Sequence, residues 1–499
     1  MNRTSGHTPS DLLVIGGGMA GLTAGAWAAR NGARVVVAER APTLGGSATF
    51  AGFVWTTPTF EALRAVNPGG DPELGRVLVD GFVDGVDWVR SVGADCGPAV
   101  TVLRYGRGHQ VDTNGYIRAC EQILRTAGAE VLTGARILSL ISGDDAVRGA
   151  ECVLADGTVR RIEARWTLLA TGGFQADQEL RAEHIHPQAR GIALRSNPYS
   201  AGGGLRLGLS AGGMFGQAEA GFYGHLVPAG VPLADPALFT ELALYYSEHG
   251  LLFNVNGERF TDETAADHLT TMALTGQPEA RGLLVGDAVT YREWITGSYV
   301  EGIPAANTFE ACRRRGARCA VADDVDEFEL IPEDWGYPGP KIRDAIEAFN
   351  AAARDGSGVS PSREFDPRPL DQPPYYVIEA APAITFSLGG LLIDREARVR
   401  GRLGGTVPGL LAAGSDVGGL YHGAYAGGLA AALIFGLTAA RTALAPGQHR
   451  HGRSLPVAEH AARPVERGTG CLGVGAVAGL GPGTSCHRYR PSHRRGTAG

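Results

Sequence analysis

The sequence predicts an α/β fold whose centre is a parallel sheet, and the prediction rests on the distribution of its apolar runs. Three such runs, Asp11–Ile15, Trp166–Phe174 and Pro408–Asp416, contain or lead into glycines, as buried parallel strands often do. With 499 residues the chain exceeds what one compact core supports, so two domains are expected. Hydrophobic residues make up 44% and charged residues 19%, which is typical of globular proteins.

The first run begins a strand–turn–helix–strand unit. DLLVI at Asp11–Ile15 is the expected first strand, and it runs directly into GGGMAG at Gly16–Gly21, which fits the GxGxxG pattern. A helix with small residues is expected over Leu22–Arg30, followed by a second apolar strand over Arg34–Ala38. A GxGxxG motif in this context predicts a dinucleotide-binding unit of the Rossmann type.

Each key residue of this unit has a physical reason. Gly16 permits the tight turn, Gly18 lets the backbone approach a pyrophosphate, and Gly21 lets the helix pack on the strand. The helix N-terminus then directs the positive end of its dipole toward the phosphates. Glu39 follows the second strand, where a carboxylate accepts hydrogen bonds from ribose hydroxyls.

The residues that follow favour FAD over NAD. The dipeptide ER at 39–40 leads to LGGS at 44–47, whose glycines let the main chain pass close to the flavin side of the cofactor. This ER…GGS pattern resembles the fumarate reductase and 3-ketosteroid dehydrogenase superfamily of flavoproteins. The resemblance implies a Rossmann-type FAD-binding domain with an inserted α+β substrate-capping domain. Covalently flavinylated relatives carry a histidine near this stretch; none occurs between Leu44 and Trp55, so non-covalent FAD is expected.

The resemblance extends over most of the chain, from about Asp11 to Ala440. WTLLATGGF at 166–174 is similar to the family's ATGG strand, and LLFNVNGERFTDE at 251–263 is similar to the VNxxGxRFxxE hairpin of its capping domain. Asn256-Gly257 is also a hairpin turn on local grounds alone. AAGSD at 412–416 ends a further strand, and a helix-like run that ends in IFG at 434–436 comes later.

These matches divide the chain into regions. The resemblance implies a discontinuous FAD-binding domain over residues 11–215 and 370–445, with the capping domain inserted over 216–369. The glycine-rich segment 202–213 resembles the exit from the FAD-binding domain, and PPYY at 373–376 marks the return. Residues 446–499 contain two acids against eight arginines and show no periodicity, so a disordered tail is predicted.

By the same resemblance, the FAD contacts fall on small and polar residues near the ends of the expected strands. It implies that Asp416 contacts the ribityl chain and that Gly414 approaches it closely. No metal site is expected. The full expected FAD-binding set is Gly16, Gly18, Ala20, Gly21, Glu39, Arg40, Gly45, Gly46, Ser47, Ala135, Ala170, Thr171, Gly172, Gly414, Asp416 and Gly428.

The cations with which fumarate reductases hold their substrate are mostly missing. Four positions after the hairpin glutamate those enzymes have an arginine for proton transfer, whereas this chain has Asp267, followed by His268. A further family histidine falls near Thr385 or Phe386, and HGAYAGG at 422–428 lacks the arginine of the family's HGANRLGG. A dicarboxylate would leave acids unpaired in a dry cavity, which costs free energy, so fumarate reduction is not favoured.

What remains resembles the ketone branch of the superfamily. Tyr425 and the glycines after it are similar to the segment with which ketosteroid dehydrogenases polarise a substrate carbonyl through a phenol and a backbone N–H. The expected catalytic residues are Tyr425, His422 as a relay, and either His268 or Asp267 as the base, since neighbours on a helix do not share a face. Further rim candidates, each interpreted first as structural, are Tyr105, His109, His225, Tyr245 and Tyr246.

Three functions stay open. The first is a ketone α,β-desaturase, or the reverse reduction, acting on a cyclic ketone or enone. The second is a carboxylate oxidoreductase resembling tricarballylate dehydrogenases, for which Arg206, Arg259 and Arg292 are the candidate cations. The third is a non-catalytic flavin electron carrier, which has no use for a cap that covers the flavin. An external electron acceptor or donor is expected, because no second nucleotide motif occurs.

Composition narrows the class of protein further. The net charge is −7, and no apolar run is long enough to span a bilayer. The first ten residues lack the apolar stretch of a signal peptide, which predicts a cytoplasmic protein. The seven cysteines are scattered and odd in number, so reduced thiols are expected. No nucleic-acid partner is expected, because no binding fold accompanies the basic tail.

Overall fold

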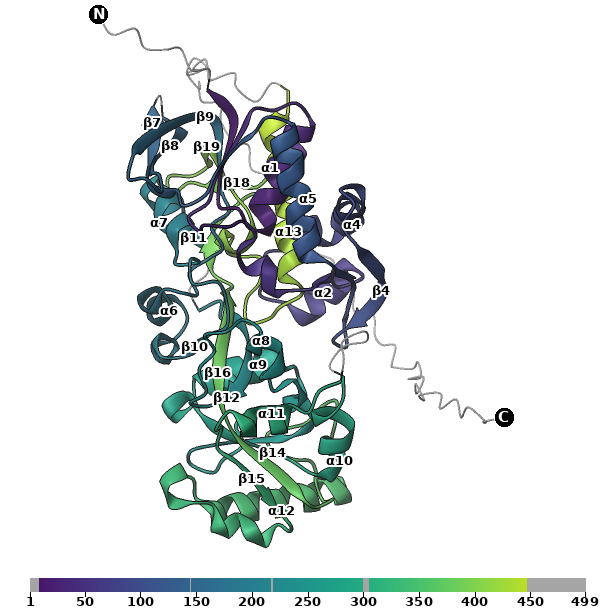
Figure 1. The fold of residues 1–499 in the computed structure, drawn as a ribbon. Coiled ribbons are helices and arrows are strands. Elements are labelled where there is room, and N and C mark those ends of the chain that lie inside the picture. The colour runs from purple at the N-terminus through teal and green to yellow at the C-terminus, as the bar shows by residue number, and fades with distance from the viewer. Residues whose placement is uncertain (1–8, 144, 217–218, 299–304, 447–499) are drawn as a thin grey trace, which may run out of the picture. The chain divides into compact units, whose positions relative to one another are not determined.

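A mixed, mainly parallel sheet gathers strands from both ends of the chain (Figure 1). The computed structural model describes residues 9–143, 145–216, 219–298 and 305–446, so the tail predicted over 446–499 lies almost entirely outside the described residues. The order of the sheet is β18-β19-β9-β1-β2-β6. Its strands are β1 (Ser10–Ile15), β2 (Val35–Ala38), β6 (Glu130–Leu132), β9 (Val159–Leu169), β18 (Arg398–Arg400) and β19 (Thr406–Ala412).

The parallel register brings the carboxyl ends of four strands, β2, β1, β9 and β19, together. Val14 of β1 lies opposite Val37 of β2 and Leu168 of β9, and Leu411 of β19 also lies opposite Leu168. β18 runs antiparallel to β19, and β7 (Arg136–Gly143) and β8 (Ala146–Val153) continue antiparallel from β9. In open parallel sheets, ligands bind beyond the carboxyl ends of the strands, so this edge is where a site is expected.

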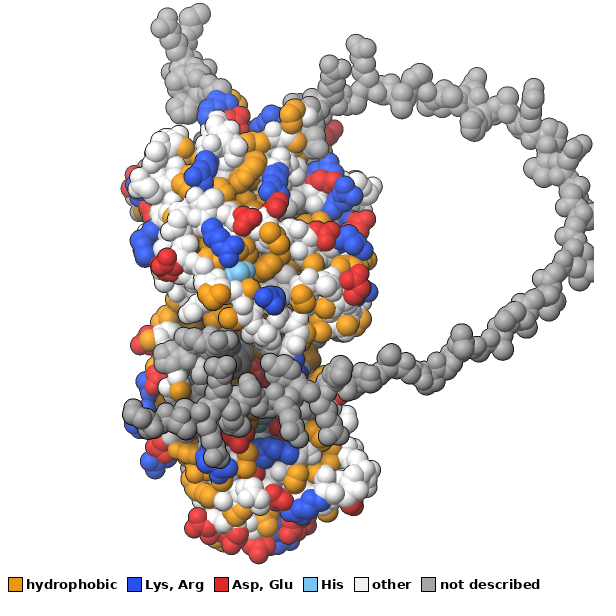
Figure 2. Space-filling view, turned by 90° about the vertical axis from the view of Figure 1, so that its right-hand side faces the viewer, with side chains coloured by type: hydrophobic (Ala, Val, Ile, Leu, Met, Phe, Trp, Pro, Cys, Tyr) orange, Lys and Arg blue, Asp and Glu red, His pale blue; other side chains and the backbone are white. Residues whose placement is uncertain are grey.

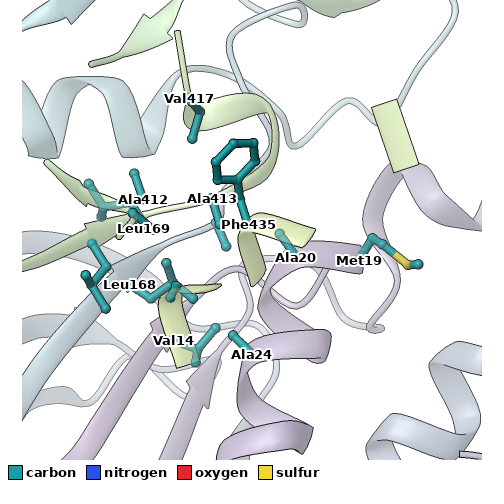
Figure 3. Close-up of a cluster of buried hydrophobic side chains, with 14 of the residues drawn as sticks. Val14, Met19, Ala20, Ala24, Leu168, Leu169, Ala412, Ala413, Val417 and Phe435 are labelled. Atoms are coloured by element: carbon teal, nitrogen blue, oxygen red, sulfur yellow. The ribbon is translucent and has the colours of Figure 1, made fainter. Parts of the chain in front are cut away.

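Three helices pack beside this sheet: α1 (Met19–Arg30), α5 (Thr113–Thr126) and α13 (Gly428–Leu444) lie side by side in Figure 1. The helix and strands predicted around the glycine motif are confirmed. Figure 3 shows how the packing works: Val14, Ala20, Leu168 and Ala412 meet Phe435 of α13, and all five side chains are buried. α1 and α13 approach closely because both have small residues at the contact. A Cβ added at Gly436 of α13 would lie 2.6 Å from the carbonyl oxygen of Ala20 in α1.

A second, six-stranded sheet forms the cap. Its centre is the 13-residue strand β16 (Tyr375–Ser387), which pairs with four other strands. The other members are β10 (Ala193–Leu194), β12 (Phe222–Pro228), β13 (Leu251–Asn254), β14 (Gly282–Gly286) and β15 (Cys319–Ala322). Helices α9 (Asp267–Thr275), α11 (Thr308–Arg314) and α12 (Gly339–Asp355) belong to the same region.

The border between the regions differs from the predicted one. β10 falls within the predicted 11–215 segment and β16 within the predicted 370–445 segment, yet both belong to the cap sheet. The composition of β16 gives no hint of this, because apolar strands of either sheet look alike in sequence. The predicted turn at Asn256-Gly257 is present: Gly257 has a φ of 73° and its N–H donates to the carbonyl of Asn254.

The remaining elements connect the two sheets or flank them. The helices are α2 (Phe60–Val66), α3 (Pro72–Asp80), α4 (Phe82–Ser91), α6 (Gln178–His184), α7 (Gly203–Ser210), α8 (Leu238–Glu241) and α10 (Ala288–Thr290). The strands are β3 (Phe53–Thr56), β4 (Cys96–Val102), β5 (Gly106–Val111), β11 (Phe215–Gly216) and β17 (Gly390–Leu391). The short 3₁₀ or π turns are η1 (Gly46–Phe50), η2 (Pro187–Arg190), η3 (Tyr245–His249), η4 (Pro278–Ala280), η5 (Tyr291–Ile295), η6 (Asp326–Leu330), η7 (Glu333–Trp335) and η8 (Gly414–Asp416).

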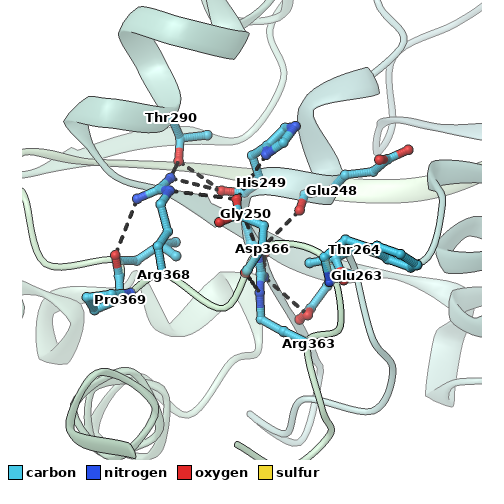
Figure 4. A network of polar contacts seen from close by, with 12 residues as sticks. Glu248, His249, Gly250, Glu263, Thr264, Thr290, Arg363, Asp366, Arg368 and Pro369 are labelled. Carbon is cyan, nitrogen blue, oxygen red and sulfur yellow. Dashed lines mark hydrogen bonds and ion pairs between the residues drawn. The ribbon is translucent and has the colours of Figure 1, made fainter. Parts of the chain in front are cut away.

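A buried arginine fixes several loops of the cap (Figure 4). The guanidinium of Arg363 is 0% exposed; it donates to the backbone carbonyls of Glu248, Gly250 and Asp366. It also forms an ion pair with Glu263, whose carboxylate is equally buried. Buried charges of this kind hold a structure in place only while both partners are present, because one alone is left without compensation.

Glu263 also accounts for one of the arginines considered as a substrate cation. Arg259 donates to both of its carboxylate oxygens, at 2.9 and 2.7 Å, and Leu252 N–H donates to it at 3.0 Å. Arg259 therefore belongs to the framework of the cap, and the prediction that offered it as a substrate ligand is wrong.

Charged side chains on the surface are of both signs. On the face shown in Figure 2, Lys and Arg are scattered among acids, and acidic side chains gather at the end of the cap that carries α12. The described part of this face presents no continuous basic surface of the kind that binds nucleic acids. Within the described ranges, no helix combines the length and the hydropathy needed to cross a lipid bilayer.

We predict that Arg363→Met lowers the free energy of unfolding by about 3–5 kcal/mol, because it leaves the Glu263 charge buried with one cation fewer. Urea unfolding followed by circular dichroism measures this. The matched control is Arg313→Met, which removes an exposed pair with Glu310 and should cost about 0–1 kcal/mol. Equal effects of the two changes would contradict the framework role of Arg363.

Candidate active site

The turn after β1 is shaped by its glycines in the way the motif predicts. Gly16 has a φ of 108°, and a Cβ there would lie 2.2 Å from the carbonyl oxygen of Ala170. A Cβ on Gly21 would lie 1.9 Å from the carbonyl oxygen of Gly16, so α1 can start only with glycine at this position. Gly18 differs from both, because the nearest protein atom to an added Cβ is 3.8 Å away. Gly18 therefore lines open space, which fits a group bound against its backbone.

Glu39 fixes the glycine turn after β1, and it also lines the open space beside Gly18. One carboxylate oxygen accepts from the N–H of Gly17 at 2.6 Å, and the other accepts from the N–H of Ala41 at 2.6 Å. Each carboxylate oxygen can accept a second hydrogen bond, so the predicted bonds from ribose hydroxyls remain chemically possible. The two backbone bonds fix the direction in which the carboxylate points.

Asp416 has a different place from the predicted one. Its carboxylate is fully buried and accepts from Thr171 N–H at 2.5 Å, from the Thr171 hydroxyl at 3.0 Å and from Gly173 N–H at 3.2 Å. It does not line the cavity described next, whereas Gly414 and Ser415 do. The side chain of Asp416 therefore positions the turn after β9, and the ribityl contact expected of it stays a prediction.

One cavity of about 510 Å³ runs from the glycine turn to the cap sheet. It opens along the carboxyl ends of β1, β9 and β19, where the sheet geometry places a ligand. Of the expected FAD-binding residues, those that line it are Gly16, Gly18, Ala20, Glu39, Arg40, Gly46, Ser47, Ala135, Ala170, Thr171, Gly172, Gly414 and Gly428. Gly21, Gly45 and Asp416 lie behind this wall and shape it. The residues present fit a dinucleotide.

At the cap end, the cavity walls become aromatic. β12 and β16 are paired there, with Tyr223 opposite Phe386. Such walls exclude water and leave a few polar groups to orient a ligand. The residues that line this end are Phe50, Trp55, Arg195, Tyr223, His225, Phe239, Thr240, Tyr245, Thr385, Phe386 and Tyr425.

Tyr425 is the predicted catalytic residue that lines the cavity. Its ring stacks on Tyr223 with centroids 3.8 Å apart and meets Trp55 edge-on at 5.2 Å. Its hydroxyl oxygen accepts from the N–H of Gly428, at the start of α13, at 3.1 Å. Burial raises the pKa of Tyr425 to about 12, although hydrogen bonds to its oxygen work in the opposite direction. The phenol therefore keeps its proton near neutral pH.

His225, considered at first only as a rim residue, forms a buried pair with Asp267. Its Nδ1 lies in close contact with the Asp267 carboxylate, and the ring itself lines the cavity. Burial lowers the pKa of His225. Burial alone would raise the pKa of Asp267, but His225 and other neighbouring charges outweigh it and lower that pKa. With Asp267 ionised, the proton sits on Nδ1, so Nε2 is the basic nitrogen of a neutral imidazole.

The other predicted catalytic residues do not line the cavity. Asp267 stands behind His225, and His268 is buried beside Tyr223 and Tyr425, where burial lowers its pKa to about 4. His422 is exposed, and its backbone N–H donates to Asn67. A relay role for His422 beside the flavin is therefore not supported by its position.

The rim candidates other than His225 divide into two groups. Tyr245 lines the cavity. Tyr105 donates to the carbonyl of Tyr425, His109 contacts the carbonyl of Gly97, and Tyr246 packs in the core of the cap, so these three have structural places.

Arg195 is the cavity residue that the sequence analysis missed. It follows β10 directly, and its N–H donates to the carbonyl of Ile384 in β16. Of the arginines that the sequence analysis considered, Arg206 lines the cavity but pairs with Asp177 at 2.6 Å, and Arg292 is exposed and does not line the cavity. The only local signal for Arg195 was its position after the apolar pair Ala193-Leu194.

Comparison with known proteins identifies the class. Residues 89–429 match the FAD binding domain family, and residues 14–59 match an NAD(P)-binding Rossmann-like domain. Because the first match spans more than half of the chain, the protein belongs to the FAD binding domain family. It is an FAD-dependent oxidoreductase, as the glycine motif and the ER…GGS pattern predicted.

Similar proteins narrow the class to the predicted superfamily. Fumarate reductase (cytochrome) of Shewanella frigidimarina is 27% identical over 459 residues, which cover 84% of this chain and 73% of that protein. 4-Oxocyclohex-2-ene-1-carboxylate 5-dehydrogenase of Sinomonas cyclohexanicum is 26% identical over 372 residues, covering 68% and 62%. The chain is therefore similar in sequence to a fumarate reductase and to a dehydrogenase of a cyclic oxo acid.

A solved structure confirms the predicted fold. The 3-ketosteroid-Δ4-(5α)-dehydrogenase from Rhodococcus jostii RHA1 superimposes with a TM-score of 0.68 at 21% identity, covering 88% of this chain and 98% of that chain. The α/β architecture with a Rossmann-type FAD-binding region is therefore shared.

We predict that Gly18→Val abolishes FAD binding without straining the protein. The Cβ of the new side chain comes no closer than 3.8 Å to a protein atom, and its methyl groups extend into the space where the pyrophosphate is expected. The ratio of visible flavin absorbance to protein absorbance should fall to baseline, while the unfolding midpoint matches that of wild-type protein stripped of flavin. A full complement of FAD in the variant would contradict this placement.

We also predict that the FAD is held without a covalent bond. Acid precipitation of the purified protein should release all of the flavin into the supernatant. Flavin fluorescence that stays with the precipitated protein, or with its peptides after digestion, would show a covalent link.

Proposed function

We propose that the protein desaturates a ketone between its α and β carbons, or reduces the corresponding enone. The observation that carries this proposal is Tyr425: a buried, protonated phenol that lines the cavity and accepts a hydrogen bond from Gly428 N–H. When bound, FAD supplies the hydride acceptor or donor of such a reaction through its N5 position.

Tyr425 acts on the carbonyl oxygen of the substrate. Its own oxygen accepts from Gly428 N–H and also interacts with the side chains of Trp55 and Tyr223. A phenol can accept hydrogen bonds and still donate its own proton, so we propose that Tyr425 donates to the ligand. A phenol in a dry cavity stabilises the negative charge that develops on a ketone oxygen as an enolate forms. The neutral donor suits a neutral ketone, because no fixed charge is left unpaired before the substrate binds.

His225 is the base in this proposal. Its Nε2 takes the proton from the α carbon, while Asp267 holds Nδ1–H and stabilises the imidazolium that results. Tyr223 lies between the two catalytic groups, stacked on Tyr425 and edge-on to His225 at 4.9 Å. In the reverse direction, His225 returns the proton to the α carbon.

The same geometry argues against an electron carrier. The cap strands β12 and β16 carry aromatic side chains over one end of the cavity, which shields that end from water. A protein that only passes electrons to a partner has no use for this cover, whereas hydride chemistry benefits from it. We propose that electrons pass to or from an external acceptor or donor.

A carboxylate oxidoreductase is the second candidate. Arg195 favours it, because it is a buried cation that lines the cavity and was not among the predicted substrate ligands. The name of the Sinomonas relative describes a substrate that has both a ketone and a carboxylate, so the two candidates need not exclude each other.

We predict that a saturated cyclic ketone bleaches the visible band of the oxidised flavin under anaerobic conditions. The set to compare contains cyclohexanone, a 3-ketosteroid, methyl 4-oxocyclohexanecarboxylate, succinate and tricarballylate. Bleaching by dicarboxylates alone would contradict the proposal. If no compound reduces the flavin, dithionite-reduced protein is tested with the matching enones, and its failure to be reoxidised by any of them would also contradict it.

We predict that Tyr425→Phe slows flavin reduction by about 10²–10³-fold, as loss of one oxyanion donor does. The control is Tyr246→Phe, a buried cap tyrosine outside the cavity, which should keep the wild-type rate. Both proteins should retain their flavin. Equal rates for Tyr425→Phe and wild type would remove Tyr425 from the mechanism.

A further inference from the structure

Arg195 is a buried cation at the cap end of the cavity. Only 8% of the residue is exposed, and it lines the cavity together with His225 and Tyr245. The backbone bond to Ile384 fixes its Cα beside β16, so the side chain does not swing out with a loop. Its position is therefore set by the cap sheet itself.

All acceptors that the guanidinium contacts are neutral. Nε donates to the carbonyl of Phe239 at 2.7 Å, Nη1 to the hydroxyl of Thr385 at 3.2 Å, and Nη2 to the hydroxyl of Tyr245 at 3.0 Å. A guanidinium has five N–H groups, so one N–H on each terminal nitrogen is left for a ligand. The three bonds orient the group without neutralising it.

The acids of this region are used elsewhere. Asp267 influences Arg195 through space, but its carboxylate contacts His225. Glu248 binds Arg104 at 2.6 Å, and Glu241 binds Arg315 at 2.9 Å. Within the described ranges Arg195 makes no ion pair, although a buried charge without a paired anion carries a large desolvation cost.

This cost points to a ligand. If Arg195 only held neighbouring groups in place, a neutral donor would serve as well, because its three acceptors need hydrogen bonds but no positive charge. The phosphates of FAD have donors of their own in the glycine turn and at the start of α1, whereas the guanidinium of Arg195 points to Phe239, Thr385 and Tyr245. What remains is an anionic group of the molecule that fills the cap end.

We propose that Arg195 binds a carboxylate of the substrate, so that the natural substrate is a cyclic ketone or enone that also bears a carboxylate. The inference rests on the proposed function for the ketone and adds the second functional group. Arginine matches a carboxylate with two parallel N–H donors, which gives both orientation and strength. Tyr425 and Arg195 then hold opposite ends of one ring.

The test is equilibrium binding to the holoenzyme without turnover. 4-Hydroxybenzoate mimics the enol and the carboxylate together, and its methyl ester keeps the shape and removes the charge. Calorimetric titration gives both dissociation constants. We expect the acid to bind wild-type protein at least tenfold more tightly than the ester, as expected for a charge-assisted pair of about 1.5 kcal/mol or more.

Arg195→Met should abolish this preference by weakening binding of the acid, with binding of the ester changed less than about threefold and the flavin content unchanged. The control is Arg292→Met, which removes an exposed cap arginine and should keep the wild-type preference. A ratio near one in wild-type protein overturns the inference without any variant. An unchanged ratio in Arg195→Met, or loss of flavin from it, overturns it too.

The two proposals fail in different ways. If a neutral ketone bleaches the flavin but the acid has no advantage over the ester, the ketone chemistry stands and the role of Arg195 is wrong. If the acid is preferred and Arg195→Met removes that preference, yet no ketone or enone exchanges electrons with the flavin, the carboxylate site stands and the ketone chemistry is wrong.

Discussion

The close approach of backbone to backbone at the carboxyl edge of the first sheet is the constraint on which the rest depends. Gly16 can turn away from β1 only because nothing projects from its Cα toward the carbonyl of Ala170. Asp416 draws the turn after β9 against η8 by accepting from Thr171 and Gly173. These contacts hold the ends of three strands at fixed spacing, so one continuous cavity forms along them. Cofactor site and substrate site are two ends of the same space.

Paired strands of the cap position several of the side chains at the cap end of the cavity. β12 and β16 lie antiparallel, which brings Tyr223 and His225 alongside Phe386 and the position of Thr385. α9 contacts β12 and carries Asp267 to the inner side of His225. Side chains on paired strands keep their spacing better than side chains on loops, which suits the base proposed at His225. Tyr425 lies in the segment before α13 and is held by Gly428 N–H and the ring of Tyr223. The buried ion pairs around Glu263 stiffen the rest of the same region.

Local signals predicted the parts of the molecule whose shape is decided locally. The glycine motif, the strands on either side of it and the turn at Asn256-Gly257 are read from residues that act within a few positions of one another, whereas most of the expected FAD-binding set was implied by the family resemblance. His225 was considered only as a rim residue and Arg195 not at all, because the place of each is set by a partner distant in sequence: Asp267 for His225 and β16 for Arg195. Asp416 shows the reverse error. Its place in a family pattern suggested a ligand contact, while its hydrogen bonds show a framework role.

The placement of β9 beside β19 has a consequence for how such proteins diversify. Two parallel neighbours must be joined by a crossover, and here the whole cap is that crossover. The entropic cost of closing such a connection rises only with the logarithm of its length, so the sheet accepts a short or a long excursion almost equally well. The substrate-recognising half can therefore be rebuilt by insertion and deletion without altering the cofactor-binding half.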